Sequence, residues 1–190
     1  MLSENVQTRK IERHRTAIVR RGLSRPVRLA LEARLFEEDA TFFDYGCGHG
    51  VDVRVIGERG YASSGWDPYY FPENETRPAD IVNLGYVINV IECQQERREA
   101  LLQAWSLARK VLIVAARVLP VERGKDDLPY GDGLITSRNT FQKYYEQQEL
   151  KHYIDSVLGT DPIPVEPGVC FVFRYESDAQ AFRAFLHRRV

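Results

Sequence analysis

Three glycines at alternate positions supply the first chemistry that this sequence offers. The apolar pair 42–43 predicts a buried strand, Asp44 closes it, and the pattern that follows predicts a helix over 51–58. The glycines between them are Gly46, Gly48 and Gly50. Because glycine has no Cβ, such a turn lets a ligand lie against the backbone, and the helix N-terminus offers free N–H groups to an anion. The segment therefore predicts the first half of a nucleotide-binding βαβ unit, with a glycine-rich turn that binds nothing as the alternative.

The spacing of the glycines distinguishes two kinds of cofactor. The dinucleotide pattern Gly-x-Gly-x-x-Gly would need a glycine where Val51 stands. The stretch resembles instead the first motif of class I S-adenosylmethionine (SAM) methyltransferases, Asp-x-Gly-x-Gly-x-Gly, with Asp44 as its acid. This resemblance implies a SAM site whose product is S-adenosylhomocysteine. The implied cofactor-binding residues are Asp44, Tyr45, Gly46, Cys47, Gly48, Gly50, Asp67, Pro68, Asn83 and Leu84.

A second acid follows the next predicted strand, which covers 61–66. Asp67 lies 23 residues after Asp44. An acid at the end of the second strand is where such folds hold a ribose, because a carboxylate accepts hydrogen bonds from two neighbouring hydroxyls. A turn formed by Asp67 with Pro68 is the alternative. The aromatic side chains within 66–70 could stack on adenine or serve only packing.

The next apolar run, 79–92, resembles the fourth strand of the same family and the loop after it. Ala79 comes only 12 residues after Asp67. That distance is too short for the third strand and its flanking helices, so the acid that binds the adenine amino group in the family has no counterpart. Either this element is abbreviated, or Asn83 and the nearby tyrosines replace it.

The resemblance places the methyl acceptor beyond the ends of the first and fourth strands. The candidates for catalysis are Tyr86, Asn89 and Asp132, and those for substrate binding are Tyr130, Gln142, Arg20 and Arg21. Ordinary loop packing is the alternative for the first two, and helix capping for Gln142. His49 is either a base or a tolerated loop residue. The sequence contains neither an Asn/Asp-Pro-Pro-Tyr motif nor a Pro-Cys nucleophile, so it does not indicate DNA base methylation by a familiar route.

The remaining patterns predict an α/β fold, Rossmann-like, with a mostly parallel sheet, an antiparallel last strand and helices on both faces. The predicted elements are a helix capped by Ser24, a helix over 94–110, a strand over 111–116, a polar loop over 120–138, a helix over 140–158, strands over 163–165 and 169–174, and a helix over 178–187. A polar loop of that length is often a lid or a binding segment.

Composition indicates one soluble domain. A chain of 190 residues with 44% hydrophobic and 28% charged residues fits an ordinary globular protein. No apolar run approaches the ~20 residues that a membrane span needs. The three cysteines are scattered without metal-ligand spacing, so we expect no metal, no membrane and a reduced cytoplasmic location.

The N-terminal part differs in charge from the rest. Residues 1–34 hold nine arginines and lysines against three glutamates, a net +6, whereas the whole chain is at −1. We therefore expect a basic helical arm over 1–22 and a SAM-binding domain over 23–190. Such an arm can bind the phosphates of DNA or RNA, or it can be a solvated extension or an oligomer contact.

Beyond the class I pattern, the chain resembles a narrower group: the methyltransferase-like family associated with DNA phosphorothioation, and related phage-type proteins. The matching segments are 23–28, 43–50, 65–70, 83–91, 130–133 and 140–144. The resemblance implies a SAM-dependent methyltransferase acting in nucleic-acid modification or in a phosphorothioation-linked defence system, together with other proteins of that system. Two alternatives stay open: a non-catalytic SAM-binding or scaffold module, and a small-molecule methyltransferase.

Overall fold

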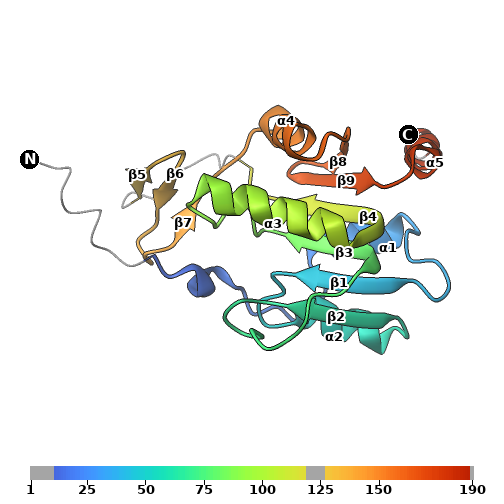
Figure 1. The fold of residues 1–190 in the computed structure, drawn as a ribbon, viewed down its shortest axis with the longest axis horizontal. Coiled ribbons are helices and arrows are strands. Elements are labelled where there is room, and N and C mark those ends of the chain that lie inside the picture. The colour runs from blue at the N-terminus through green and yellow to red at the C-terminus, as the bar shows by residue number, and fades with distance from the viewer. Residues whose placement is uncertain (1–10, 119–126, 189–190) are drawn as a thin grey trace, which may run out of the picture.

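A six-stranded sheet in the order β2-β1-β3-β4-β9-β8 forms the centre of the molecule (Figure 1). The computed structural model describes residues 11–118 and 127–188. The strands are β1 (Thr41–Tyr45), β2 (Ala62–Trp66), β3 (Ala79–Gly85), β4 (Ala108–Ala115), β8 (Ile163–Glu166) and β9 (Val169–Phe173). Strands β1 to β4 pair in parallel, and β9 runs antiparallel to both β4 and β8. This confirms the predicted sheet.

Helices cover both faces of this sheet and bury two separate cores. They are α1 (Arg25–Glu32), α2 (Val51–Glu58), α3 (Gln94–Leu107), α4 (Gln147–Leu158) and α5 (Glu176–His187). Side chains alternate along a strand, so Phe43 packs with α3 and α4 while its neighbour Phe42 packs with α1, α2 and α5. The α/β fold with helices on both faces is therefore confirmed, and α2 has the predicted bounds.

A second, three-stranded antiparallel sheet lies beside the first, where the sequence predicted a loop and the start of a helix. Its strands are β5 (Leu128–Tyr130), β6 (Gly133–Ile135) and β7 (Phe141–Gln142). The predicted loop over 120–138 was thus wrong for its second half, and 119–126 lie outside the described residues. The predicted helix over 140–158 was wrong for 140–146. Helix α4 begins only at Gln147, because the Glu149 carboxylate accepts the Glu146 backbone N–H at 3.2 Å and caps the first turn there.

The link between β2 and β3 is short, as predicted. Residues 67–78 contain an isolated bridge between Asp67 and Phe71 but no helix or strand, so β2 lies at the edge of the sheet. The Asn74 side chain donates to the Gly65 carbonyl at 2.9 Å on this edge. This short connection stands where the family has a third strand with flanking helices, so that part of the fold is abbreviated.

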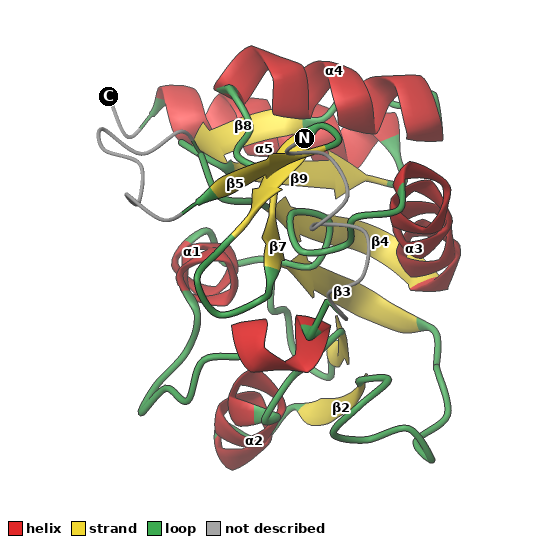
Figure 2. Ribbon diagram, turned by 90° about the vertical axis from the view of Figure 1, so that its left-hand side faces the viewer, coloured by secondary structure: helices red, strands yellow, loops and turns green. Residues whose placement is uncertain are grey.

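Residues 11–22, which we call the strap, cross in front of the carboxyl ends of the parallel strands (Figure 2). The predicted helical arm is wrong for this part, because it contains only a 3₁₀ turn, η1 (Arg13–Thr16). The rest of the arm, including Arg9 and Lys10, lies outside the described residues. Within the described ranges, no helix is long and apolar enough to cross a membrane, and no cluster of His, Cys, Asp or Glu suits a metal ion.

Candidate functional site

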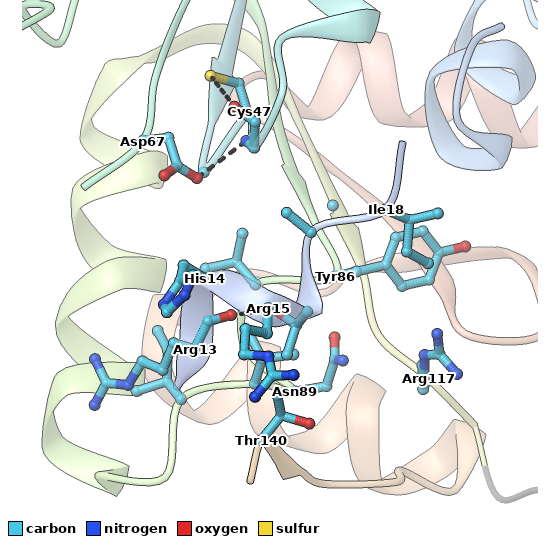
Figure 3. Close-up of a pocket in the computed structure, with 18 of the residues that line it drawn as sticks. Arg13, His14, Arg15, Ile18, Cys47, Asp67, Tyr86, Asn89, Arg117 and Thr140 are labelled. Carbon is cyan, nitrogen blue, oxygen red and sulfur yellow. Dashed lines mark hydrogen bonds between the residues drawn. The ribbon is translucent and has the colours of Figure 1, made fainter. Parts of the chain in front are cut away.

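A cavity of about 1640 Å³ lies at the carboxyl ends of β1, β3 and β4, the edge at which open α/β sheets bind ligands. The glycine turn, the end of β2, the loop after β3, helix α3, the strap and parts of 136–144 line it. Single-ligand sites usually occupy about 300–1000 Å³, so this cavity has room for two ligands. Figure 3 shows Asp67 and Cys47 on one side, Asn89 and Thr140 on the other, and His14 and Arg15 of the strap between them.

The glycine turn adopts a backbone shape that other residues rarely take. Gly46, Gly48 and Gly50 have φ angles of +80°, +53° and +72°. At Gly46 a Cβ atom would come within 2.5 Å of Val87 Cγ2, so a side chain has no room there. The turn is tied to β2, because the N–H groups of Gly46 and Cys47 both donate to the Trp66 carbonyl, at 2.8 and 3.0 Å. The backbone therefore forms a fixed wall of the cavity.

Asp67 joins this turn to the segment after β2. Its Oδ2 accepts the Gly48 N–H at 3.0 Å, and its Oδ1 accepts the N–H groups of Tyr69 and Tyr70 at 2.9 and 3.0 Å. Asp67 thus makes the expected turn and also lines the cavity beside the glycines. The two interpretations from the sequence are compatible, because one carboxylate has about four acceptor positions and three are used.

A buried acidic pair lies below the turn. Asp44 and Asp52 are 3% and 1% exposed, and Asn83 Nδ2 donates to Asp44 Oδ1 at 2.7 Å. Burial, together with the charge of Asp52, raises the pKa of Asp44 to about 7. Asp52 Oδ2 accepts from Arg20 at 3.1 Å, and its Oδ1 accepts the Ser24 N–H at 2.7 Å. Arg20, predicted to bind substrate, is therefore engaged by a buried carboxylate.

Aromatic side chains line the side of the cavity where adenine was expected. The rings of Tyr45 and Trp66 lie 5.1 Å apart, and the Tyr45 hydroxyl donates to Gln103 of α3. Asn83 and Leu84 do not line the cavity, since Asn83 binds Asp44 and Leu84 is fully buried in the core. Tyr45 and Trp66 therefore line the cavity, whereas Asn83 does not.

Side-chain contacts hold the strap over the cavity. Arg13 donates to both Glu92 oxygens at 2.8 and 2.9 Å and also binds Glu96 on α3. The His14 ring stacks on Tyr69 at 4.1 Å, and the His14 carbonyl accepts from the Tyr70 hydroxyl at 3.0 Å. Ala17 packs on the glycine turn, with its Cβ 3.2 Å from where a Gly48 side chain would start. The strap therefore narrows access to the turn.

The opposite wall contains an amide side chain without a partner. Asn89 is 1% exposed and lines the cavity, and among the described residues neither its Nδ2 nor its Oδ1 has a hydrogen-bond partner. Its backbone carbonyl is engaged, accepting the Lys143 N–H at 2.8 Å. Tyr86, also at the cavity, has a φ of +64°, a conformation that non-glycine residues rarely adopt and that often marks functional sites. The predicted acceptor residues Tyr86 and Asn89 thus lie on one wall.

Residues 142–145 form the rest of this wall in an extended conformation. Gln142 and Tyr144 line the cavity, whereas Lys143 and Tyr145 point away from it, as a two-residue period requires. The helix predicted here would have placed these side chains differently. Two residues after β4, Arg117 also lines the cavity, and its carbonyl accepts the Tyr145 N–H at 2.9 Å.

Asp132 and Tyr130, the other predicted acceptor residues, do not line the cavity. Asp132 accepts two hydrogen bonds from the buried Arg97, at 2.6 and 3.1 Å, and lies 3.6 Å from Lys143 Nζ. These charges hold the pKa of Asp132 below its usual value although burial opposes them. Tyr130 packs edge-on against Phe141. Both residues hold the small sheet in place.

The structure thus brings together eleven of the eighteen candidate residues. Lining the cavity are Tyr45, Gly46, Cys47, Gly48, Asp67, Pro68, Tyr86, Asn89, Gln142, Arg20 and His49; its lining does not include Asp44, Gly50, Asn83, Leu84, Tyr130, Asp132 and Arg21. Burial raises the pKa of the Cys47 thiol, so a thiolate nucleophile is disfavoured. Sequence reasoning missed Arg13 and Arg117. The position of Arg117 after a strand end was the available signal.

Comparison with solved structures identifies the fold. CalS10, a SAM-bound amino pentose methyltransferase from Micromonospora echinaspora, is 14% identical, with 79% of this chain and 88% of that chain covered at a TM-score of 0.53. DesVI from Streptomyces venezuelae is 11% identical, with 78% and 90% covered and a TM-score of 0.56. A Burkholderia thailandensis 1,6-didemethyltoxoflavin-N1-methyltransferase, with 1,6-didemethyltoxoflavin and S-adenosylhomocysteine bound, is 12% identical, with 86% and 79% covered and a TM-score of 0.55.

No family model and no curated protein matches the sequence. The structural likeness nevertheless establishes the Rossmann-like fold of class I SAM-dependent methyltransferases, as the glycine motif predicted.

Proposed function

We propose that this chain is a SAM-dependent methyltransferase whose cofactor and acceptor meet in the cavity at the carboxyl ends of β1, β3 and β4. The observation that carries the proposal is the pairing of Asp67 with the glycine turn. The Asp67 carboxylate, which follows the end of β2, accepts the N–H of Gly48 at 3.0 Å, and Gly48 has a left-handed backbone conformation. Both residues line a cavity that is large enough for two ligands. The fold is shared with SAM-bound enzymes.

The residues present fit the chemistry of SAM. Asp67 keeps one free acceptor position for a ribose hydroxyl, and the backbone of Gly46 and Gly48 lines the cavity beside it. Tyr45 and Trp66 line the cavity, and their rings would pack against an adenine. When bound, SAM supplies a methyl group on a positively charged sulfur.

The protein's own part is alignment and exclusion of water. Asn89 and Tyr86 would hold the acceptor on the wall opposite the glycine turn, and the strap would cover both ligands through Arg13 and Ala17. Correct alignment of two bound reactants is worth up to about 7–11 kcal/mol of the barrier. His49, which lines the cavity beside the Tyr70 ring, is the candidate base for an acceptor that holds its proton at neutral pH.

The wider role predicted from the sequence is part of this proposal. The resemblance to the phosphorothioation-associated family supports nucleic-acid modification. The solved structures support a small-molecule acceptor, since two are named as acting on an amino pentose and on 1,6-didemethyltoxoflavin. Asp132 has no catalytic role in the proposal, because it is engaged by Arg97.

Calorimetric titration of SAM and of S-adenosylhomocysteine tests the cofactor site. We expect both to bind the wild-type chain, and Asp67→Ala to weaken binding about tenfold or more, since a hydrogen bond to a charged group contributes about 1.5–3 kcal/mol. Glu73→Ala is the matched control, because it removes an exposed carboxylate from the same connection. Failure of the wild type to bind either compound, with its fold intact by circular dichroism, would overturn the proposal.

A further inference from the structure

We infer that the acceptor is a nucleotide unit, whose base lies along Asn89 and Tyr144 and whose phosphate binds Arg117. The inference rests on the proposed function for its role in methyl transfer, but it concerns a separate wall of the cavity. Arg117 was not among the predicted substrate residues. The structure bonds the carbonyls of both Asn89 and Arg117 to the segment 142–145, and both residues line the cavity.

The buried side-chain amide of Asn89 is free to bind a ligand. A buried amide without partners is rare in proteins, and such groups are usually satisfied by water or by a ligand. Its side chain offers donors on Nδ2 and an acceptor on Oδ1, and both are without partners among the described residues. A purine or pyrimidine edge presents a complementary donor and acceptor side by side, which is why Asn commonly pairs with adenine. The neighbouring Gln142 Nε2 is already engaged by the carbonyls of Asn89 and Lys143, so the unsatisfied amide is that of Asn89.

The backbone fixes the second group relative to the first. The Lys143 N–H donates to the Asn89 carbonyl, and two residues later the Tyr145 N–H donates to the Arg117 carbonyl, at 2.8 and 2.9 Å. Tyr144 lies between these two bonds and lines the cavity. One extended segment therefore aligns an amide, an aromatic ring and a guanidinium along a single wall. Aromatic rings in such positions stack on bases with little regard to sequence.

The arginines that line the cavity differ in whether a carboxylate already neutralises them. The strap arginines at the cavity are already paired, Arg13 with Glu92 and Glu96, Arg15 with Glu12, and Arg20 with Asp52. Two other arginines that line the cavity, Arg117 and Arg138, are exposed and have no carboxylate partner within the described ranges. Arg117 is the one whose carbonyl is bonded to Tyr145, next to Tyr144. A guanidinium binds phosphate through two parallel hydrogen bonds. A neutral or cationic sugar would leave Arg117 without a partner, whereas a phosphorylated base satisfies all three side chains.

Titration of AMP, GMP, CMP and UMP, in the absence of SAM, tests the inference. We expect at least one of them to bind more tightly than its nucleoside, and Arg117→Ala to abolish that difference with about a tenfold loss of affinity. Arg109→Ala is the matched control, since it removes an exposed arginine from the opposite end of β4. Asn89→Ala removes no side-chain hydrogen bond, so it should fold as well as the wild type and still lose about fivefold or more in affinity for the preferred base.

A short single-stranded DNA and a short single-stranded RNA identify the source of the nucleotide. Tighter binding of an oligonucleotide than of any mononucleotide, still dependent on Arg117, assigns a nucleic-acid strand, and equal or weaker binding assigns a free nucleotide; both support the inference. It is overturned if none of these compounds binds a chain that does bind SAM, or if Arg117→Ala and Asn89→Ala bind them as the wild type does. Nucleotide binding without SAM binding would overturn the proposed function instead.

Discussion

The two walls of the cavity are built in different ways. The glycine turn is one continuous segment, and positive φ angles at Gly46, Gly48 and Gly50 give it its shape locally. The acceptor wall is assembled from segments far apart in the chain, through bonds such as those from Lys143 to Asn89 and from Tyr145 to Arg117. The first wall therefore depends on backbone conformation. The second wall depends on a few polar contacts, such as those of Asp132 with Arg97 and Lys143, which hold the small sheet in position. The following changes test that difference.

The largest effect should come from Asp132→Asn, which removes the charge that balances the buried Arg97. The Arg97 side chain is 3% exposed, and an uncompensated buried charge typically costs about 3–5 kcal/mol. We expect urea unfolding to show a loss of about 3 kcal/mol. Asp161→Asn, which weakens exposed pairs with Lys151 and Arg183, should cost no more than about 1 kcal/mol. A stable Asp132→Asn chain with reduced turnover would mean that Asp132 is catalytic.

Gly46→Ala tests the glycine wall. It forces alanine into a left-handed conformation and places its Cβ 2.5 Å from Val87 Cγ2, so we expect a loss of about 2–4 kcal/mol. Gly131→Ala is the matched control, because its φ is +55° but nothing lies within 4 Å of its Cβ. It should lose only the conformational part, about 1–2 kcal/mol. Equal losses in denaturant unfolding would show that contact with Val87 is unimportant.

The pH dependence of stability tests the acidic pair below the turn. Burial and the Asp52 charge raise the folded pKa of Asp44 from 3.8 to about 7. Between these two pH values, Asp44 is protonated in the folded state and ionised in the unfolded state. This contribution is complete below about pH 4 and is lost as the pH rises to 7, with a slope of at most about 1.4 kcal/mol per pH unit. Asp44→Asn should remove the slope. An unchanged profile in thermal unfolding would mean that Asp44 does not titrate there.

The smallest effect should follow Arg13→Ala, which loosens the strap. Arg13 is one-third exposed, so loss of its pairs with Glu92 and Glu96 should lower local stability by only about 1 kcal/mol. Hydrogen exchange should then speed up within 11–22 and leave β1 and β3 unchanged. Arg21→Ala, which removes an exposed arginine with no ion pair in the described part of the chain, should change neither region.

The same difference explains what the sequence could predict. Helix α2 and the positions of Asp67 and Asn89 follow from local patterns, because a glycine turn or a strand end is visible in a few adjacent residues. The extended wall at 142–145 was predicted as a helix, because its apolar spacing suits either period and only the cap at Glu146 decides. The role of Asp132 depends on Arg97, 35 residues away, and no local pattern reports such a partner. The strap was predicted as part of a helical arm, and its contacts with Glu92 and Tyr70 across the cavity could not be predicted for the same reason.

The short connection after β2 has a consequence for behaviour in solution. It leaves β2 at the sheet edge, and exposed edge strands pair readily with other chains. Here the Asn74 side chain occupies the Gly65 carbonyl, and the connection carries Pro68, Pro72 and Pro78. Proline cannot donate to a neighbouring strand, and prolines near an edge are a known defence against edge-to-edge pairing. The segment that shortens the fold beside the cavity therefore also guards the chain against aggregation.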